Sequence, residues 1–143
     1  MNATPSHRAI SAHWRFHHLG VATRRLAREV EGWRAIGYSQ EGAGFEDAVQ
    51  GVRGIFLTGP GPRLEILEPL AGSTMLDGWI DRGIRIYHQA FEVPDIKVAL
   101  DAVSLLGAKT VVHPVSAVAF DGRLIAFTML PTMHMMEFIE TPA

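Results

Sequence analysis

The sequence repeats one short pattern, first as Leu64-Glu65-Ile66-Leu67-Glu68-Pro69 in the middle of the chain and again as Met136-Glu137-Phe138-Ile139-Glu140-Thr141-Pro142 at its end. The first glutamate of each copy lies 47 and 49 residues after a histidine that begins an apolar run, His18 and His88 respectively. A fixed period of this kind indicates a duplicated structural unit. Two histidines and two glutamates at matching positions of the two copies predict a metal site.

The hydrophobic pattern around these copies predicts the same order of elements twice: a strand, a helix and then about three strands. Helices are expected from Thr23, as cap, to Gly37 and from Pro94 to Gly107, because their apolar residues recur every three to four positions. Residues 41–51 are expected to form a glycine-bearing loop. The predicted strands are 14–22, 52–58, 63–68, 85–93, 109–113 (stopped by Pro114), 124–129 and 135–140.

This order predicts an α+β fold in which two tandem βαβββ modules form a curved mixed sheet around a central metal site. Residues 1–13 are expected to be an N-terminal tail, and residues 14–142 a single domain. The modules are expected at about 14–70 and 85–142, joined by a linker helix at about 73–83.

Composition excludes several classes of protein. Nearly half of the 143 residues are apolar (48%) and 20% are charged, which is ordinary for a globular protein. A net charge of -2 gives no basic surface for nucleic acid. The chain contains no cysteine, so any metal must be held by histidine nitrogen and carboxylate oxygen. No apolar run approaches membrane-spanning length, and a cytoplasmic location is expected.

Strand alternation selects one histidine and one glutamate from each module. Successive side chains of a strand point to opposite faces, so the apolar neighbours of His18, Glu65, His88 and Glu137 lie on the other face, where helices can cover them. The four polar side chains then point to the uncovered, concave face. The remaining candidates are expected on the opposite face from these four: His17, Glu68 and Glu140.

The combination resembles the vicinal oxygen chelate superfamily, which has the glyoxalase and bleomycin-resistance fold. Within that superfamily, four stretches are similar to the signature strands of methylmalonyl-CoA epimerases. These stretches are Phe16–Ala22, Leu64–Pro69, Ile86–Ile96 and Met136–Glu140. The resemblance covers roughly residues 14–141 and is specific in the combination of strands rather than in any single one.

The resemblance implies metal ligands at His18, Glu65, His88 and Glu137, with a whole site in each chain. Its cofactor would be a divalent ion (Zn, Co, Ni or Mn) that stabilises the enolate formed when a carbon next to a carbonyl loses a proton. Glu137 is the expected base, and Glu65 is the corresponding residue of the first module. The expected partners are a small-molecule carbonyl or thioester substrate and a second copy of the chain, as a homodimer.

Two departures from the epimerases concern the second acid of a two-base epimerisation and the substrate pocket, and the second of them indicates a different substrate. Those enzymes carry a further acid soon after a Gln-Gly-Val stretch, but the matching position here is Gly54; Glu46 and Asp47, nearby in sequence, are possible substitutes. The loops that shape the thioester pocket are replaced by residues 117–122 and 130–132, which are largely apolar.

Three other functions compete with an epimerase-like isomerase. A glyoxalase I-like lyase for glutathione hemithioacetals would use the same four ligands. An extradiol dioxygenase uses two histidines and one glutamate, so Glu65 is not expected there. A binding protein of the bleomycin-resistance type would be non-catalytic, and such proteins generally lack the full ligand set.

Overall fold

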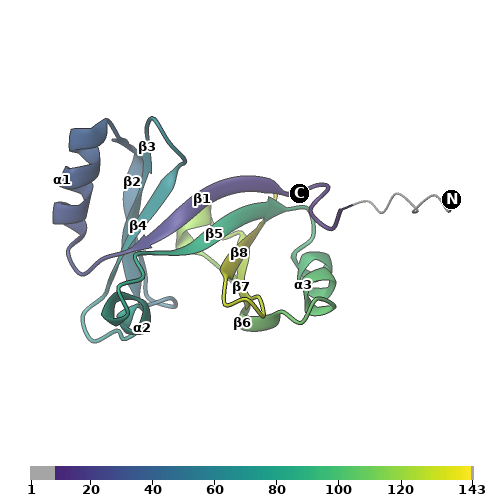
Figure 1. Ribbon diagram of the computed structural model, residues 1–143. Helices are drawn as coiled ribbons and strands as arrows, with labels where there is room; N and C mark the ends of the chain where they lie inside the picture. Colours follow the sequence, from purple (N-terminus) through teal and green to yellow (C-terminus); the bar gives the residue numbers. More distant parts are fainter. Residues whose placement is uncertain (1–8, 143) are drawn as a thin grey trace, which may run out of the picture.

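The computed structural model describes residues 9–142 and shows the predicted repeat (Figure 1). A strand, a helix and three strands occur twice, with one short helix between the two sets. The first set is β1 (Arg15–Ala22), α1 (Leu26–Ile36), β2 (Ser39–Asp47), β3 (Val52–Thr58) and β4 (Leu64–Pro69), followed by α2 (Asp77–Asp81). The second set is β5 (Ile86–Val93), α3 (Ile96–Ser104), β6 (Lys109–Ser116), a 3-10 turn (Val118–Phe120), β7 (Leu124–Met129) and β8 (Met135–Glu140).

All eight strands form one mixed sheet in the order β2-β3-β4-β1-β5-β8-β7-β6. The first strands of the two sets, β1 and β5, run antiparallel to each other at its centre. Each also pairs in parallel with the last strand of its own set, β1 with β4 and β5 with β8. The four strands that carry the repeated histidines and glutamates are therefore the four central strands, and the α+β prediction is confirmed.

The two long helices cover separate parts of the sheet, α1 at one end and α3 at the other (Figure 1). Val30 of α1 packs in one buried cluster with Val21, Leu64 and Ile66. The equivalent cluster joins α3 to the second set of strands, and its members are Val93, Ile96, Ala99, Val103, Ala108, Ala126 and Phe138. The apolar neighbours of the four candidate ligands thus lie under the helices, as alternation predicts.

The second glutamate of each repeated pattern caps a helix. Glu68 accepts a hydrogen bond from the backbone N–H of Leu26 (2.8 Å), and Glu140 accepts one from the N–H of Ile96 (3.0 Å). A carboxylate at this position satisfies a free amide of the first turn and interacts favourably with the helix dipole. Thr23, expected as the cap of α1, instead accepts from the N–H of Arg25.

The expected loop at 41–51 is wrong over its first part, because residues 39–47 form strand β2. This strand is at the edge of the sheet and its pairing with β3 shifts between Glu41 and Phe45. Most of its side chains are exposed, and Gly42 and Gly44 have none, so no apolar alternation marks it.

Two other expected boundaries differ from the structure. Strand β6 continues through Pro114 to Ser116, because β6 is the other edge of the sheet and a proline there costs no ladder hydrogen bond. The linker helix, expected at about 73–83, is only five residues long as α2.

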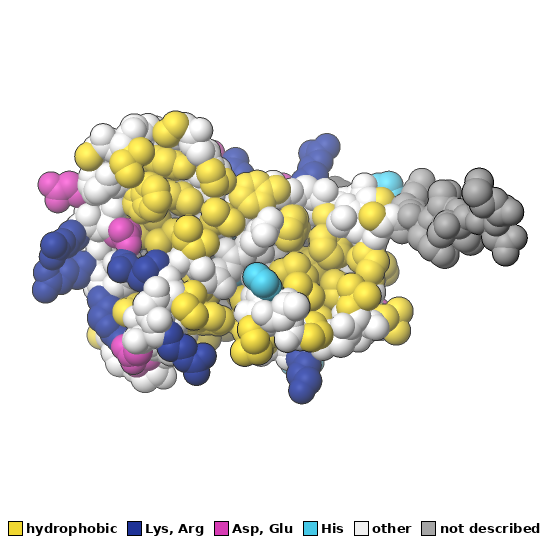
Figure 2. Space-filling model, viewed as in Figure 1, with side chains coloured by type: hydrophobic (Ala, Val, Ile, Leu, Met, Phe, Trp, Pro, Cys, Tyr) yellow, Lys and Arg dark blue, Asp and Glu magenta, His cyan; other side chains and the backbone are white. Residues whose placement is uncertain are grey.

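The predicted tail, residues 1–13, falls largely outside the described residues; its described end forms a turn in which the Trp14 N–H donates to Ser11 O (3.0 Å). Within residues 9–142, no helix has the length and apolar character needed to cross a membrane. In the view of Figure 2, hydrophobic side chains cover much of the surface, while basic and acidic side chains occur together at the end that carries α1 and α2.

Candidate metal centre

The four predicted side chains meet at the centre of the sheet. The Nε2 atoms of His18 and His88 lie 3.1 Å apart. Glu65 Oε1 and Glu137 Oε1 each lie 3.2 Å from His18 Nε2, and 3.6 and 3.3 Å from His88 Nε2. All four residues are buried, and one ligand atom from each lies within 4.8 Å of all the others.

Strand register explains this convergence. Gly20 of β1 lies opposite both Glu65 of β4 and His88 of β5. Ala90 of β5, the counterpart of Gly20 in the repeat, likewise lies opposite both His18 and Glu137. A small residue at each centre leaves room for the ligands around it. At Gly20 this is essential, because an added Cβ would overlap the His88 ring.

The spacing of these atoms fits a metal ion. Nitrogen and oxygen ligands at ~2.1 Å from one ion are ~3.0 Å apart at right angles and ~3.4 Å apart at tetrahedral angles. The five distances above run from 3.1 to 3.6 Å. In addition, Glu137 Oε1 is close to both imidazoles, yet no ring N–H is aligned with it, and it has no hydrogen-bond partner among the described residues. A buried carboxylate oxygen in this state is suited to a cation.

Electrostatics also favours positive charge between the two carboxylates. Burial alone would lower the pKa of the His18 imidazole, but the adjacent Glu65 and Glu137 outweigh it and raise this pKa to about 9. The pKa of His88 is raised in the same way, against the effect of its burial. Burial raises the pKa of Glu65, but both histidines outweigh it and hold that pKa well below its usual range. Protons on the imidazoles thus supply charge that a divalent ion would supply equally well.

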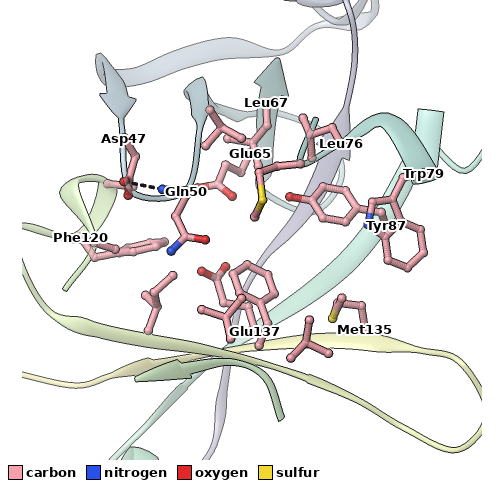
Figure 3. A pocket seen from close by; sticks show the side chains of 18 of the residues that line it. Asp47, Gln50, Glu65, Leu67, Leu76, Trp79, Tyr87, Phe120, Met135 and Glu137 are labelled. Atoms are coloured by element: carbon pink, nitrogen blue, oxygen red, sulfur yellow. Dashed lines mark hydrogen bonds between the residues drawn. The ribbon is translucent and has the colours of Figure 1, made fainter. Parts of the chain in front are cut away.

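A cavity of about 140 Å³ opens beside the quartet, and the two glutamates line it. Figure 3 shows Glu65 and Glu137 reaching into this space from opposite sides, with Tyr87 and Phe120 at its two flanks. Most of the lining is apolar, and its other members include Phe45, Val52, Leu67, Leu76, Trp79, Val112, Ala117, Ile125, Phe127 and Met135. The site can therefore hold a small, largely apolar molecule against the two carboxylates.

The structure separates the three positions considered for a further acid. Gly54 has no room for one, because a Cβ there would lie closer than 3.0 Å to Leu67, Phe45 and the backbone of Ile66. Glu46 is exposed and pairs with Arg53 (3.1 Å).

Asp47 is buried and lines the cavity. Its Oδ1 accepts the backbone N–H groups of Val49 and Gln50, both at 3.0 Å, which fixes the carboxylate in place. The Gln50 side chain reaches into the same space (Figure 3).

The expectation that His17 points away from His18 is wrong. Their rings lie 5.0 Å apart, and the two Nδ1 atoms are 2.8 Å apart. Sequence reasoning also missed Tyr87, whose ring meets the His88 ring edge-on at 4.5 Å, and Phe120, whose ring stacks on His18 at 5.9 Å. The only sequence signal for His17 and Tyr87 is that each directly precedes a candidate ligand.

Comparisons with known proteins agree with this architecture. Residues 17–127 match the family described as the glyoxalase/bleomycin resistance protein/dioxygenase superfamily. The chain is 26% identical over 115 residues to an ethylmalonyl-CoA/methylmalonyl-CoA epimerase of Cereibacter sphaeroides, and the match covers 79% of this chain and 86% of that protein.

Two solved structures share the fold. One is methylmalonyl-CoA epimerase from Mycobacterium tuberculosis, with a TM-score of 0.73 and 21% identity over 90% of this chain and 88% of that one. The other is a variant of the Streptomyces coelicolor methylmalonyl-CoA epimerase in complex with 2-nitronate-propionyl-CoA, with a TM-score of 0.72 and 24% identity over 90% and 98% of the two chains.

The family match covers more than two thirds of the sequence, and the duplicated module and the central quartet agree with it. This chain therefore belongs to the glyoxalase/bleomycin resistance protein/dioxygenase superfamily, also known as the vicinal oxygen chelate superfamily.

Proposed function

We propose that the protein is an enzyme that binds one divalent metal ion through His18, Glu65, His88 and Glu137 and moves a proton at a carbon next to a carbonyl. The observation that carries this proposal is the convergence of the four buried side chains at distances suited to one ion. The similarity to epimerases of CoA thioesters supports the same kind of chemistry.

A bound ion in this position would act as a Lewis acid and stabilise the negative charge that develops on the substrate oxygen. The chain's own residues would do the rest. The Glu137 carboxylate borders the cavity and would take the proton from the substrate carbon. The apolar lining, including Phe120 and Leu76, would exclude water and strengthen each charge interaction inside.

Asp47 is the residue best placed to serve a second face of the substrate carbon. Its Oδ1 is held by two backbone amides, which leaves Oδ2 to give or take a proton. Glu137 and Asp47 come from opposite halves of the chain and line one cavity. In the proposed epimerisation they would act on opposite faces of the substrate carbon. A substrate that enters this cavity would be a small carbonyl compound or thioester.

Deuterium exchange at the α-carbon of methylmalonyl-CoA in heavy water tests the proposal. The protein is stripped of metal and reloaded with cobalt or zinc, and exchange is followed by NMR or mass spectrometry. Metal-dependent wash-in that is lost in Glu137→Ala supports proton transfer on this substrate. The same protein is assayed with the glutathione hemithioacetal of methylglyoxal, since turnover there would favour the lyase alternative.

If the protein binds one ion per chain but shows neither activity, the metal site is retained and both substrates are excluded. Absence of bound metal would overturn the proposal. A homodimer and a cytoplasmic location stay predictions from the sequence.

A further inference from the structure

A bulge places His17 beside its neighbour. Along the β1–β5 pairing, Phe16 lies opposite Phe91, whereas His18 lies opposite Ala90, so His17 is an extra residue without a partner on β5. A β-bulge turns the side chain of the extra residue out of the normal alternation. His17 therefore points to the same face as His18, and its Nδ1 reaches the Nδ1 of His18.

The other half of the repeat shows what is particular about His17. The pairing shifts again between Gly20 and Val21, and here the extra residue is Tyr87, directly before His88. Tyr87 meets the His88 ring edge-on, and His88 Nδ1 has no hydrogen-bond partner among residues 9–142. His88 is thus held by packing, whereas His18 is held by a hydrogen bond.

The direction of that hydrogen bond depends on which nitrogen of His18 carries a proton. Only one proton fits between the two Nδ1 atoms, which are 2.8 Å apart. An ion bound to His18 Nε2 would take the place of a proton there, so His18 would carry its proton on Nδ1 and donate it to His17 Nδ1. His17 then carries its own proton on Nε2.

The surroundings hold His17 in this orientation. Its ring contacts the buried rings of Phe56 and Phe120 edge-on, at centroid distances of 5.8 and 5.4 Å. Its backbone carbonyl accepts a hydrogen bond from Arg63 Nη1 (2.9 Å), and Arg63 is in turn paired with Glu41. Both the side chain and the backbone of His17 are therefore fixed.

We propose that His17 is a positioning residue for the metal site: its Nδ1 accepts the Nδ1–H of His18 and so holds the His18 ring with Nε2 directed at the ion. This inference rests on the proposed function, because it assigns His17 a role toward the same metal. Some residues accept a hydrogen bond from the ring nitrogen of a ligating histidine that does not bind the metal. Replacing such a residue usually lowers metal affinity by about 10- to 100-fold.

The test compares two substitutions with different hydrogen-bonding ability. His17→Phe keeps an aromatic ring against Phe56 and Phe120 but removes the acceptor, whereas the amide oxygen of His17→Asn takes the place of Nδ1. Competition with a chelator gives the zinc affinity of each. We expect a loss of about 10- to 100-fold for His17→Phe and near-complete rescue by His17→Asn. His113→Phe, at an exposed histidine of β6, is the matched control and should bind zinc as the wild type does.

A second measurement reads the hydrogen bond directly. In the 15N-histidine-labelled, zinc-loaded protein, NMR should show a solvent-protected Nδ1–H on His18 and a 15N–15N coupling across the bond to His17. Both signals should disappear in His17→Phe. Wild-type zinc affinity in His17→Phe, or equal losses in His17→Phe and His17→Asn, would overturn the inference and leave the metal site intact. A wild-type protein that takes up no metal would instead overturn the proposed function and the role of His17 with it.

Discussion

Replacement of Gly20 by alanine should displace His88 from the proposed metal site. The added Cβ would lie closer than 3.0 Å to three atoms of the His88 ring, Cε1, Nδ1 and Nε2. Non-bonded carbon atoms are normally ~3.5–4.0 Å apart, so the ring would have to retreat by on the order of 1 Å. Metal ligands tolerate deviations of only ~0.2 Å, so Nε2 would no longer reach the ion.

The expected loss of zinc affinity in Gly20→Ala is at least about 100-fold. Replacing a residue that is hydrogen-bonded to a ligand already lowers metal affinity by about 10- to 100-fold, and here the ligand itself moves. Overpacking at this buried position should also lower the free energy of unfolding by ~1–3 kcal/mol. Zinc affinity is measured by competition with a chelator, and stability by urea unfolding of the metal-free protein.

Gly32→Ala is the matched control. Gly32 lies within α1, and a Cβ there meets no atom within 4 Å. The same change should leave zinc affinity unaltered and raise the free energy of unfolding by ~0.5–1 kcal/mol, because alanine is the better helix former. If Gly20→Ala binds one zinc per chain as tightly as Gly32→Ala, the reasoning that assigns His88 to the site is refuted.

Three further predictions concern the helix cap, the second acid and the metal. Glu140→Ala should lower the free energy of unfolding by ~1 kcal/mol in urea titrations, because the N–H of Ile96 loses its acceptor, while zinc affinity stays unchanged; a lost zinc site would contradict its assignment as a cap. Asp47→Asn should keep the turn through its amide oxygen and keep deuterium wash-in, but should stop interconversion of substrate enantiomers in a chiral assay; retained interconversion would exclude Asp47. Zinc at 100 times its dissociation constant should stabilise the protein by ~2.7 kcal/mol in thermal unfolding, reversibly with a chelator, and an unchanged unfolding temperature would count against a native-state site.

The four residues of the quartet were predictable because strand alternation is regular around Glu65 and Glu137. It is also regular on the C-terminal side of His18 and His88, beyond the bulged residue that precedes each of them. Leu64 and Ile66 mark the helix-covered face of β4, so Glu65 had to lie on the other. The internal repeat then supplied the same reasoning for β8. The separation of Glu65 from Glu68 into different roles follows from the same period of two.

His17 was not predictable, because a bulge is a property of strand pairing rather than of one strand's pattern. Its sequence context is the same whether or not β5 matches β1 residue for residue. Strand β2 was missed for a related reason: an edge strand with glycines and exposed side chains carries no periodic signal. The position of Asp47 beside the cavity depends on how the turn after β2 folds against it, and only tertiary packing determines this.

Binding of one ion by both histidines and both glutamates is tested most directly by anomalous diffraction at the cobalt absorption edge from crystals of cobalt-loaded protein. We expect one anomalous peak per chain, at ~2.0–2.2 Å from His18 Nε2, His88 Nε2 and a carboxylate oxygen of both Glu65 and Glu137. A peak elsewhere, or none between β1, β4, β5 and β8 at full cobalt loading, would contradict the account.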